Sequence, residues 1–216
     1  MSSWRAQVGQ PDTVGSGNQA LWLENTNPDG NDVAAAQFGG LEGVPVQSLT
    51  GLEWQHRNDS DCGKTSPRWT VAIERGAKTT LVRFGCALAA HSPGSAPGWT
   101  RDSDSQAFIR AEIIKAGGRN LLLGTIKSLA IVYDVRGKFG HTILDNIRIS
   151  STAVGVQRWT FAGDNAATTP GPPAALSNDR LAQPLSDFEG MTFDELWPTL
   201  TPDEQALAQS QDPVTE

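Results

Sequence analysis

Apolar and polar residues alternate along much of the chain between residues 19 and 161. An alternation with a period of two is typical of a β-strand that buries one face and exposes the other. Clusters of Gly, Pro, Asn and Asp separate the alternating segments, as expected for turns. The clearest segments lie at residues 19–24, 52–56, 69–73, 82–86, 129–135, 143–149 and 157–161. About eight to ten short strands of this kind predict a mainly β fold, an antiparallel β-sandwich of the jelly-roll type.

The segment 105–116 fits two structures. Its apolar positions alternate as in a strand, but AFIRAEIIKA also consists of residues with fair helix propensity. Because propensity is weak evidence against tertiary context, the sequence leaves both a strand and a helix open.

The composition of the chain divides it into four parts. Residues 1–18 are polar and rich in Gly, Ser and Gln, which indicates an N-terminal arm, and residues 19–163 form the predicted sandwich. Residues 164–190 are rich in Pro, Ala, Thr and Ser, which is typical of a linker or an extended strap. Residues 191–216 form an acidic tail.

Two capping signals predict short helices in this tail. Thr192 precedes Glu195 by three positions, and Thr201 precedes both Pro202 and Glu204. A Thr followed three residues later by Glu is a capping box, and Pro is favoured at the first helical position.

Three large apolar residues in the tail share one face of the first predicted helix. Phe193, Trp197 and Leu200 are spaced i, i+4 and i+7. Such a short helix is unstable alone in water, so we expect it to dock against the same sandwich or a neighbouring chain. The alternative is a tail that only adds solubility.

The negative charge of the chain is concentrated at its C-terminal end. Residues 164–216 contain ten acidic residues and one basic residue, whereas residues 1–163 carry a net charge of +2. Neither part has the basic cluster that a nucleic-acid backbone attracts, so no nucleic-acid partner is expected.

No apolar run of about 18 residues occurs, so no membrane span is expected. The first residues lack a signal-peptide core, so export would need a removed signal or another route.

The two cysteines are Cys62 and Cys86, near the ends of predicted strands. A disulfide is favoured, because the composition suits a secreted protein and there is no third or fourth sulfur ligand for zinc. The alternative is two unrelated thiols. A closed loop of this size stabilises the fold by roughly 3 kcal/mol.

No catalytic motif is present, and no enzymatic activity is expected; a Ser-His-Asp triad, whose members can lie far apart in sequence, is the alternative that stays open. The fragment CGKT at 62–65 lacks the first glycine of a phosphate-binding loop. The three histidines have no metal-site spacing, and no GxSxG motif occurs. No ExDxxE-like run of alternate carboxylates occurs, and Glu53, Glu74 and Glu112 are expected to be solvated.

Tryptophan is frequent, with seven residues in the chain. Trp54 and Trp69 fall at apolar strand positions and are expected in the core. Trp99 follows the loop HSPGSAPG and is the best candidate for an exposed aromatic platform that stacks against a sugar ring. Packing in the interior is its alternative role.

Two parts of the chain carry a family resemblance: 54–100, with RNDSDCGKTSPRWTVAI, RFGCA and PGWT, and 128–150, with SLAIVYDVRG and TILDNIRIS. Together they resemble a group of secreted actinobacterial β-sandwich proteins, most of them uncharacterised. The segment LDNIRI also resembles the last strand of jelly-roll carbohydrate-binding modules. The resemblance covers about half of the chain and implies a Cys62–Cys86 disulfide and a jelly roll, but no activity.

In those carbohydrate-binding modules an aspartate of the last strand helps to hold a structural calcium ion, together with a glutamate near the first strand. The matching positions here are Asp145 and Glu24. Calcium prefers several oxygen ligands, which carboxylates supply. The chain departs from the modules at its first strand, where WLENTNPDG replaces their F-E-x-G run, and in its acidic tail.

These observations predict a non-catalytic extracellular binding module for a surface or a polymer, with carbohydrate as a candidate ligand. The alternative is a structural subunit of an assembly, such as a virion decoration protein or a surface filament, held together by its termini. Its partner would be another protein or a second copy, bound through the acidic tail. Both functions place the chain outside the cell, or on a cell or virion surface.

Overall fold

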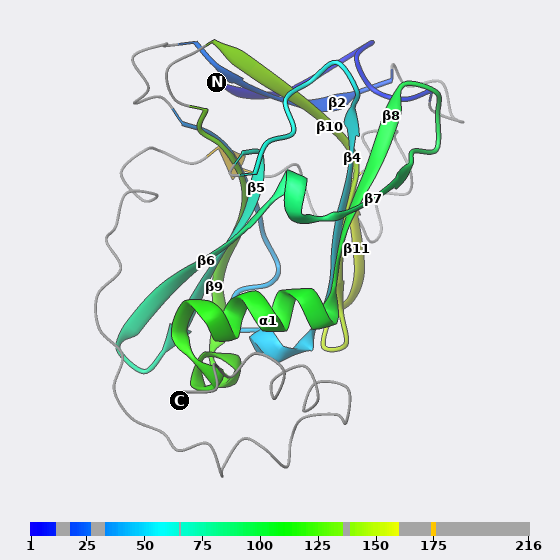
Figure 1. Cartoon of the computed structure of the whole chain (residues 1–216). Helices are drawn as coiled ribbons and strands as arrows, with labels where there is room; N and C mark the ends of the chain where they lie inside the picture. The colour runs from blue at the N-terminus through cyan, green and yellow to red at the C-terminus, as the bar shows by residue number, and fades with distance from the viewer. Residues whose placement is uncertain (12–17, 27–32, 65, 136–138, 160–173, 176–216) are drawn as a thin grey trace, which may run out of the picture.

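The computed structural model describes residues 1–11, 18–26, 33–64, 66–135, 139–159 and 174–175. Two antiparallel sheets pack face to face, which confirms the predicted β-sandwich (Figure 1). Among the described residues, no helix has the length and apolar character needed to cross a membrane.

The first sheet has seven strands, and we call it sheet A. Its order is β1 (Ser2–Arg5), β2 (Ala20–Asn25), β10 (Gly140–Ser151), β4 (Leu49–Arg57), β8 (Trp99–Ser105) and β7 (Ala90–Pro93), with β11 (Gly155–Trp159) also on β10. The long strand β10 is central, because it pairs with β2 along 140–144, with β11 along 147–151 and with β4 along 144–151.

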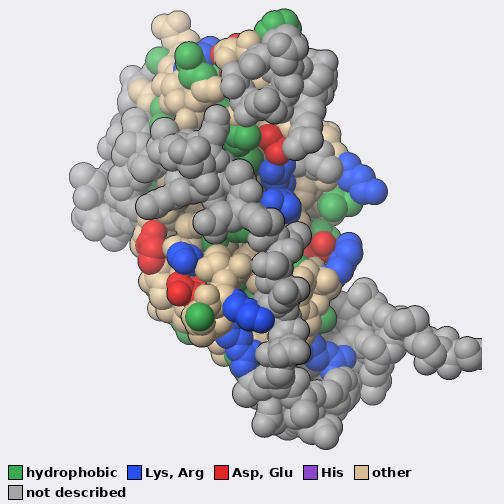
Figure 2. All heavy atoms as spheres, turned by 90° about the vertical axis from the view of Figure 1, so that its left-hand side faces the viewer, with side chains coloured by type: hydrophobic (Ala, Val, Ile, Leu, Met, Phe, Trp, Pro, Cys, Tyr) green, Lys and Arg blue, Asp and Glu red, His purple; other side chains and the backbone are tan. Residues whose placement is uncertain are grey.

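The second sheet has five strands, and we call it sheet B. Its order is β12 (Ala174–Ala175), β3 (Ala34–Phe38), β9 (Thr125–Tyr133), β5 (Arg68–Arg75) and β6 (Lys78–Gly85). The outer face of this sheet carries the exposed cations Arg83 and Lys127. Figure 2 shows several Lys and Arg side chains, in blue, on the side of the molecule where β6 and β9 lie.

The core fills the space between the two sheets. Trp54 of β4 and Trp69 of β5 are each 1% exposed, and their rings stack with centroids 4.9 Å apart. Phe38 packs against both Trp69 and Trp159. The predicted core positions of Trp54 and Trp69 are therefore confirmed.

Residues 106–117 form helix α1 (Gln106–Gly117), which decides between the two structures that the sequence left open. The side chain of Ser105 accepts a hydrogen bond from the Phe108 amide and caps the helix, and Ile109 and Ile113 bury one face. The helix lies across the side of the sandwich between β6 and β8 (Figure 1). The described residues also contain three short 3-10 helices: η1 (Val46–Ser48), η2 (Cys86–Leu88) and η3 (Arg119–Leu123).

The N-terminal arm differs from the prediction. Residues 2–5 form β1, because their main-chain groups pair with β2 from Leu23 to Ala20. Of the predicted linker 164–190, the structure describes only β12, whose backbone pairs with β3. The tail 191–216, with Phe193, Trp197 and Leu200, lies outside the described residues.

Candidate functional site

The outer face of sheet A carries rows of polar side chains that cross several strands. Arg148 of β10 lies opposite Glu53 of β4, and Glu53 lies opposite Ser103 of β8. Ser150 and Ser105 flank Gly51 in the same way, one row further along. Since side chains alternate along a strand, these residues face away from the core that Leu52 and Trp54 enter.

An open depression of about 460 Å³ lies over these rows. Its lining contains hydroxyl groups, two acidic side chains, a guanidinium and several apolar groups: Thr50, Gly51, Leu52, Glu53, Leu88, Ala89, Ala90, Ser103, Asp104, Ser105, Phe108, Arg148 and Ser150. It extends to the end of β8, at Asp104 and Ser105. These two residues have no neighbour on β7, because β7 pairs only with residues 100–103. We call it the outer-face depression.

Two lining residues carry polar atoms that the protein leaves unsatisfied. Arg148 Nε and Asp104 Oδ1 are both buried, and neither has a hydrogen-bond partner within the described part of the chain. Buried polar groups are nearly always paired, so a water molecule is the natural partner of each atom. The two atoms lie on opposite faces of sheet A, because Arg148 points outward and Asp104 points inward. Glu53 differs from them, because its carboxylate pairs with Arg101 at 2.5 Å.

The pKa of Asp104 is raised to about 7, first by burial and then by repulsion from Asp102 and Glu112. Asp104 therefore holds a proton over much of the acidic range, where ordinary aspartates are charged. In that state its carboxyl group can donate a hydrogen bond as well as accept one.

The apolar alternation of the sequence did not point to Asp102 and Asp104 as two buried carboxylates on one strand. Asp102 and Asp104 stand at alternate positions of β8, so both point to its inner face. The run RDSDS contained the signal, but alternating aspartates do not match the apolar alternation by which the other strands were found. Glu53, expected to be solvated, is only 17% exposed and lines the outer-face depression.

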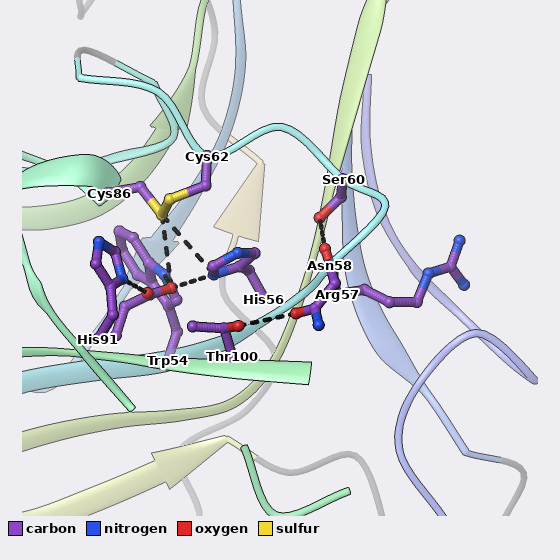
Figure 3. Close-up of a disulfide and its surroundings, with 10 residues drawn as sticks. Trp54, His56, Arg57, Asn58, Ser60, Cys62, Cys86, His91 and Thr100 are labelled. Atoms are coloured by element: carbon purple, nitrogen blue, oxygen red, sulfur yellow. Dashed lines mark hydrogen bonds and ion pairs between the residues drawn. A yellow bond between two sulfur atoms is a disulfide. The ribbon is translucent and has the colours of Figure 1, made fainter. Parts of the chain in front are cut away.

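A second polar cluster surrounds Asp102. The Trp54 indole donates a hydrogen bond from Nε1 to Asp102 Oδ2 at 2.7 Å. His56 Nδ1 lies 2.5 Å from the same oxygen, and His91 Nδ1 lies 2.6 Å from Oδ1 (Figure 3). Asp102 is 1% exposed, His56 10% and His91 43%. A buried carboxylate with three nitrogen partners is well satisfied.

The predicted disulfide between Cys62 and Cys86 is present beside this cluster, with Cα atoms 5.3 Å apart. Cys62 follows β4 of sheet A, and Cys86 follows β6 of sheet B, so the bond clamps the two sheets together. Cys86 Sγ lies 3.5 Å from Asp102 Oδ2 and 3.9 Å from His56 Nδ1. While the bond is formed, neither sulfur is a thiolate, so neither serves as a metal ligand.

Asp145 and Glu24, the predicted calcium ligands, are not brought together. They lie on neighbouring strands, but Glu24 is opposite His141, four residues from Asp145, which separates them by about 13 Å. The Asp145 carboxylate accepts hydrogen bonds from the Gln10 and Asn146 amides at 2.8 and 2.6 Å. Glu24 Oε2 accepts one from the Trp22 indole at 3.2 Å and pairs with an arginine, Arg5. Strand register thus gives each carboxylate its own structural partners.

Trp99 does not form the exposed platform that the loop before it suggested. It is 7% exposed and packs with Ala20 and Ile143 on the outer face of sheet A. The loop folds back over it: the Gly94 amide donates to the Trp99 carbonyl at 2.9 Å. A Cβ atom at Gly94 would lie 2.7 Å from the Trp99 side chain, so this close approach requires glycine.

Trp22 is a more exposed aromatic residue, but its faces are occupied. The His141 ring stacks on it with centroids 4.5 Å apart, and the Arg5 guanidinium lies 4.1 Å from its centroid. This stack therefore offers no open ring face to a sugar.

No protein-family model, no curated protein and no solved structure matches this chain. The resemblance to secreted actinobacterial proteins therefore stays a prediction, and function has to be argued from the geometry of the described residues.

Proposed function

We propose that the chain is a non-catalytic extracellular module that binds a polyhydroxylated polymer, such as a glycan, in the outer-face depression. The observation that carries this proposal is the row of outward-facing polar side chains in the lining of one open hollow, among them Arg148, whose Nε has no hydrogen-bond partner within the described residues.

The lining suits the chemistry of a sugar. Hydroxyl groups of a sugar both donate and accept hydrogen bonds, so they can pair with the Arg148 guanidinium and with hydroxyl groups of the lining. The hydroxyls of Ser103, Ser105 and Ser150 add further donors and acceptors, and Phe108 supplies an aromatic wall for the apolar face of a ring. A few polar groups placed among apolar ones are typical of small-ligand sites.

The same geometry supports binding without hydrolysis. Glycoside hydrolysis uses two carboxyl groups that both reach the substrate. The Asp102 side chain is 1% exposed and already contacts the Trp54 indole and the imidazoles of His56 and His91. Glu53 is paired with Arg101. Asp104 points to the inner face of β8, so this trio does not present two free carboxyl groups on the outer face.

The disulfide supports an oxidising compartment, because such bonds persist mainly outside the cytoplasm. An extracellular module that meets polymers of a wall or a surface agrees with this compartment.

Binding to defined polysaccharides tests the proposal. Affinity electrophoresis in gels containing xylan, laminarin or hydroxyethyl cellulose, and pull-down with chitin and peptidoglycan, measure retention of the full chain. We expect retention on at least one polymer, and Arg148→Ala should weaken it by at least about tenfold, since a hydrogen bond to a charged group contributes about 1.5–3 kcal/mol.

Arg83→Ala is the matched control, because it removes an exposed arginine from the outer face of sheet B. It should leave retention unchanged. Absence of retention on every polymer, or equal losses in both variants, would contradict a glycan site in the outer-face depression.

A further inference from the structure

The disulfide and its neighbours bring four potential metal ligands together. One donor atom from each of His56, Cys62, Cys86 and Asp102 lies within 4.8 Å of the other three. His56, Cys86 and Asp102 are buried, and Cys62 is half-buried. The sequence supplied too few cysteines for a zinc site, but the fold adds the missing nitrogen and oxygen ligands from β4 and β8.

We propose that reduction of the Cys62–Cys86 disulfide converts this cluster into a tetrahedral zinc site. A dithiol reductant transfers two electrons and two protons to the bond and becomes a disulfide itself, which leaves two thiols in the protein. Zn²⁺ then binds both sulfurs as thiolates and displaces their two protons, with His56 Nδ1 and Asp102 Oδ2 as the third and fourth ligands.

The distances around the cluster suit a zinc ion. Zinc binds sulfur at about 2.3 Å and nitrogen or oxygen at about 2.0–2.2 Å, so tetrahedral ligands are about 3.3–3.8 Å apart. Cys86 Sγ already lies 3.5 Å from Asp102 Oδ2 and 3.9 Å from His56 Nδ1. Two distances have to change: the 2.5 Å contact between His56 and Asp102 opens by about 1 Å, and after reduction the two sulfurs separate from bonding distance to about 3.8 Å.

The surroundings would hold the ligands in place after reduction. The Trp54 indole and His91 orient the Asp102 carboxylate, as outer partners of metal-binding carboxylates do. The loop that carries Cys62 is fixed separately, because the Tyr133 hydroxyl donates to the neighbouring Asp61. The Ala87 amide, beside Cys86, donates to the carbonyl of Gly63 at 3.1 Å. Cleavage of the disulfide therefore leaves both sulfurs near the cluster.

The two states exclude each other, since one pair of sulfur atoms cannot form a disulfide and bind zinc as thiolates. The chain would be clamped by a covalent bond where conditions are oxidising and by zinc where they are reducing. This inference is independent of the outer-face depression.

Metal titration of the full chain under anaerobic conditions tests it. After reduction with a dithiol and its removal, Co²⁺ is added as a spectroscopic probe, followed by Zn²⁺. We expect one Co²⁺ per chain with the absorption of tetrahedral thiolate coordination, displacement by one Zn²⁺, and a higher melting temperature with zinc. The oxidised chain should show none of these changes.

Two conservative variants assign the ligands. Asp102→Asn and the Cys62→Ser change should each weaken Co²⁺ binding at least about tenfold or abolish its thiolate absorption. His141→Ala removes a histidine outside the cluster and should bind as the unaltered chain does. If a variant does not fold, the titration of the unaltered chain decides alone. A reduced chain that binds no Co²⁺ or Zn²⁺, or an unchanged thiolate spectrum in folded Cys62→Ser, would overturn the proposal.

Discussion

Trp54 and Asp102 lie opposite each other on β4 and β8, and the indole nitrogen donates a 2.7 Å hydrogen bond to the buried carboxylate. This contact joins the aromatic core to the polar cluster beside the disulfide. A hydrogen bond to a charged group contributes about 1.5–3 kcal/mol, so it is a sensitive test of the arrangement.

Trp54→Phe should lower the free energy of unfolding by at least about 1.5–3 kcal/mol, because Asp102 loses a donor. Trp159→Phe is the matched control, since the buried Trp159 indole has no hydrogen-bond partner within the described residues. Urea unfolding measures both. Equal losses in the two variants would mean that packing, not the hydrogen bond, accounts for the effect.

Stability should fall as the pH rises from about 4 to about 7, through the contribution of Asp104. Its pKa is raised from 3.8 to about 7, so the folded state binds a proton that the unfolded state has already released in this range. Each pH unit should cost up to about 1.4 kcal/mol. Asp104→Asn removes this dependence, and the difference between the two urea-unfolding series isolates it. Parallel series would argue against a raised pKa.

The purified chain should contain no free thiol when it is unfolded without reductant, because Cys62 and Cys86 are bonded. Replacing both by alanine should destabilise the metal-free chain by roughly 3 kcal/mol. Thiol labelling and melting in the presence of a chelator measure the two effects. Two reactive thiols per chain would contradict the disulfide.

Excess chelator should leave the melting temperature of the oxidised chain unchanged, since Asp145 and Glu24 each have protein partners and lie about 13 Å apart. Asp145→Ala, in contrast, should destabilise the chain, because the Gln10 amide loses its acceptor. A drop in melting temperature with chelator, restored by Ca²⁺, would establish a calcium site that uses other ligands.

The tail remains a separate prediction, because it lies outside the described residues. If Phe193 and Trp197 dock, their double replacement by alanine should lower the melting temperature or the oligomeric state. Deletion from Leu176 onward, which keeps β12, should do the same. The exposed cations of sheet B, such as Arg83 and Lys127, offer a complementary charge. Light scattering after size exclusion separates the assembly from the simple module. No change in either variant would leave the tail without a docking role.

The sequence predicted those strands whose core-facing positions are apolar. The strands around Trp54 and Trp69 were found because period-two alternation follows directly from burial on one side. The apolar alternation did not predict β7 or β8. All residues of β7 (AHSP) are exposed, and the inner face of β8 (WTRDSDS) buries aspartates in place of apolar residues. Helix α1 was decided by one cap, Ser105, and by the packing of Ile109 and Ile113.

The candidate sites depend on contacts between distant parts of the chain, which no local pattern contains. Asp102 meets His56 and His91 only because β8 pairs with β4 on one side and β7 on the other. Trp99 was misjudged for the same reason, since its burial depends on a loop that folds back and on strands far away in sequence.

The Cys62–Cys86 bond also determines how the chain transmits mechanical tension. Residues 63–85, with β5 and β6, lie inside a covalent ring, so a pull on the two ends of the chain passes through the sulfur atoms and bypasses this hairpin. The ring withholds roughly 80 Å of extensible length, because an extended residue spans about 3.3–3.6 Å. A force-spectroscopy trace of the reduced chain should be longer by that increment.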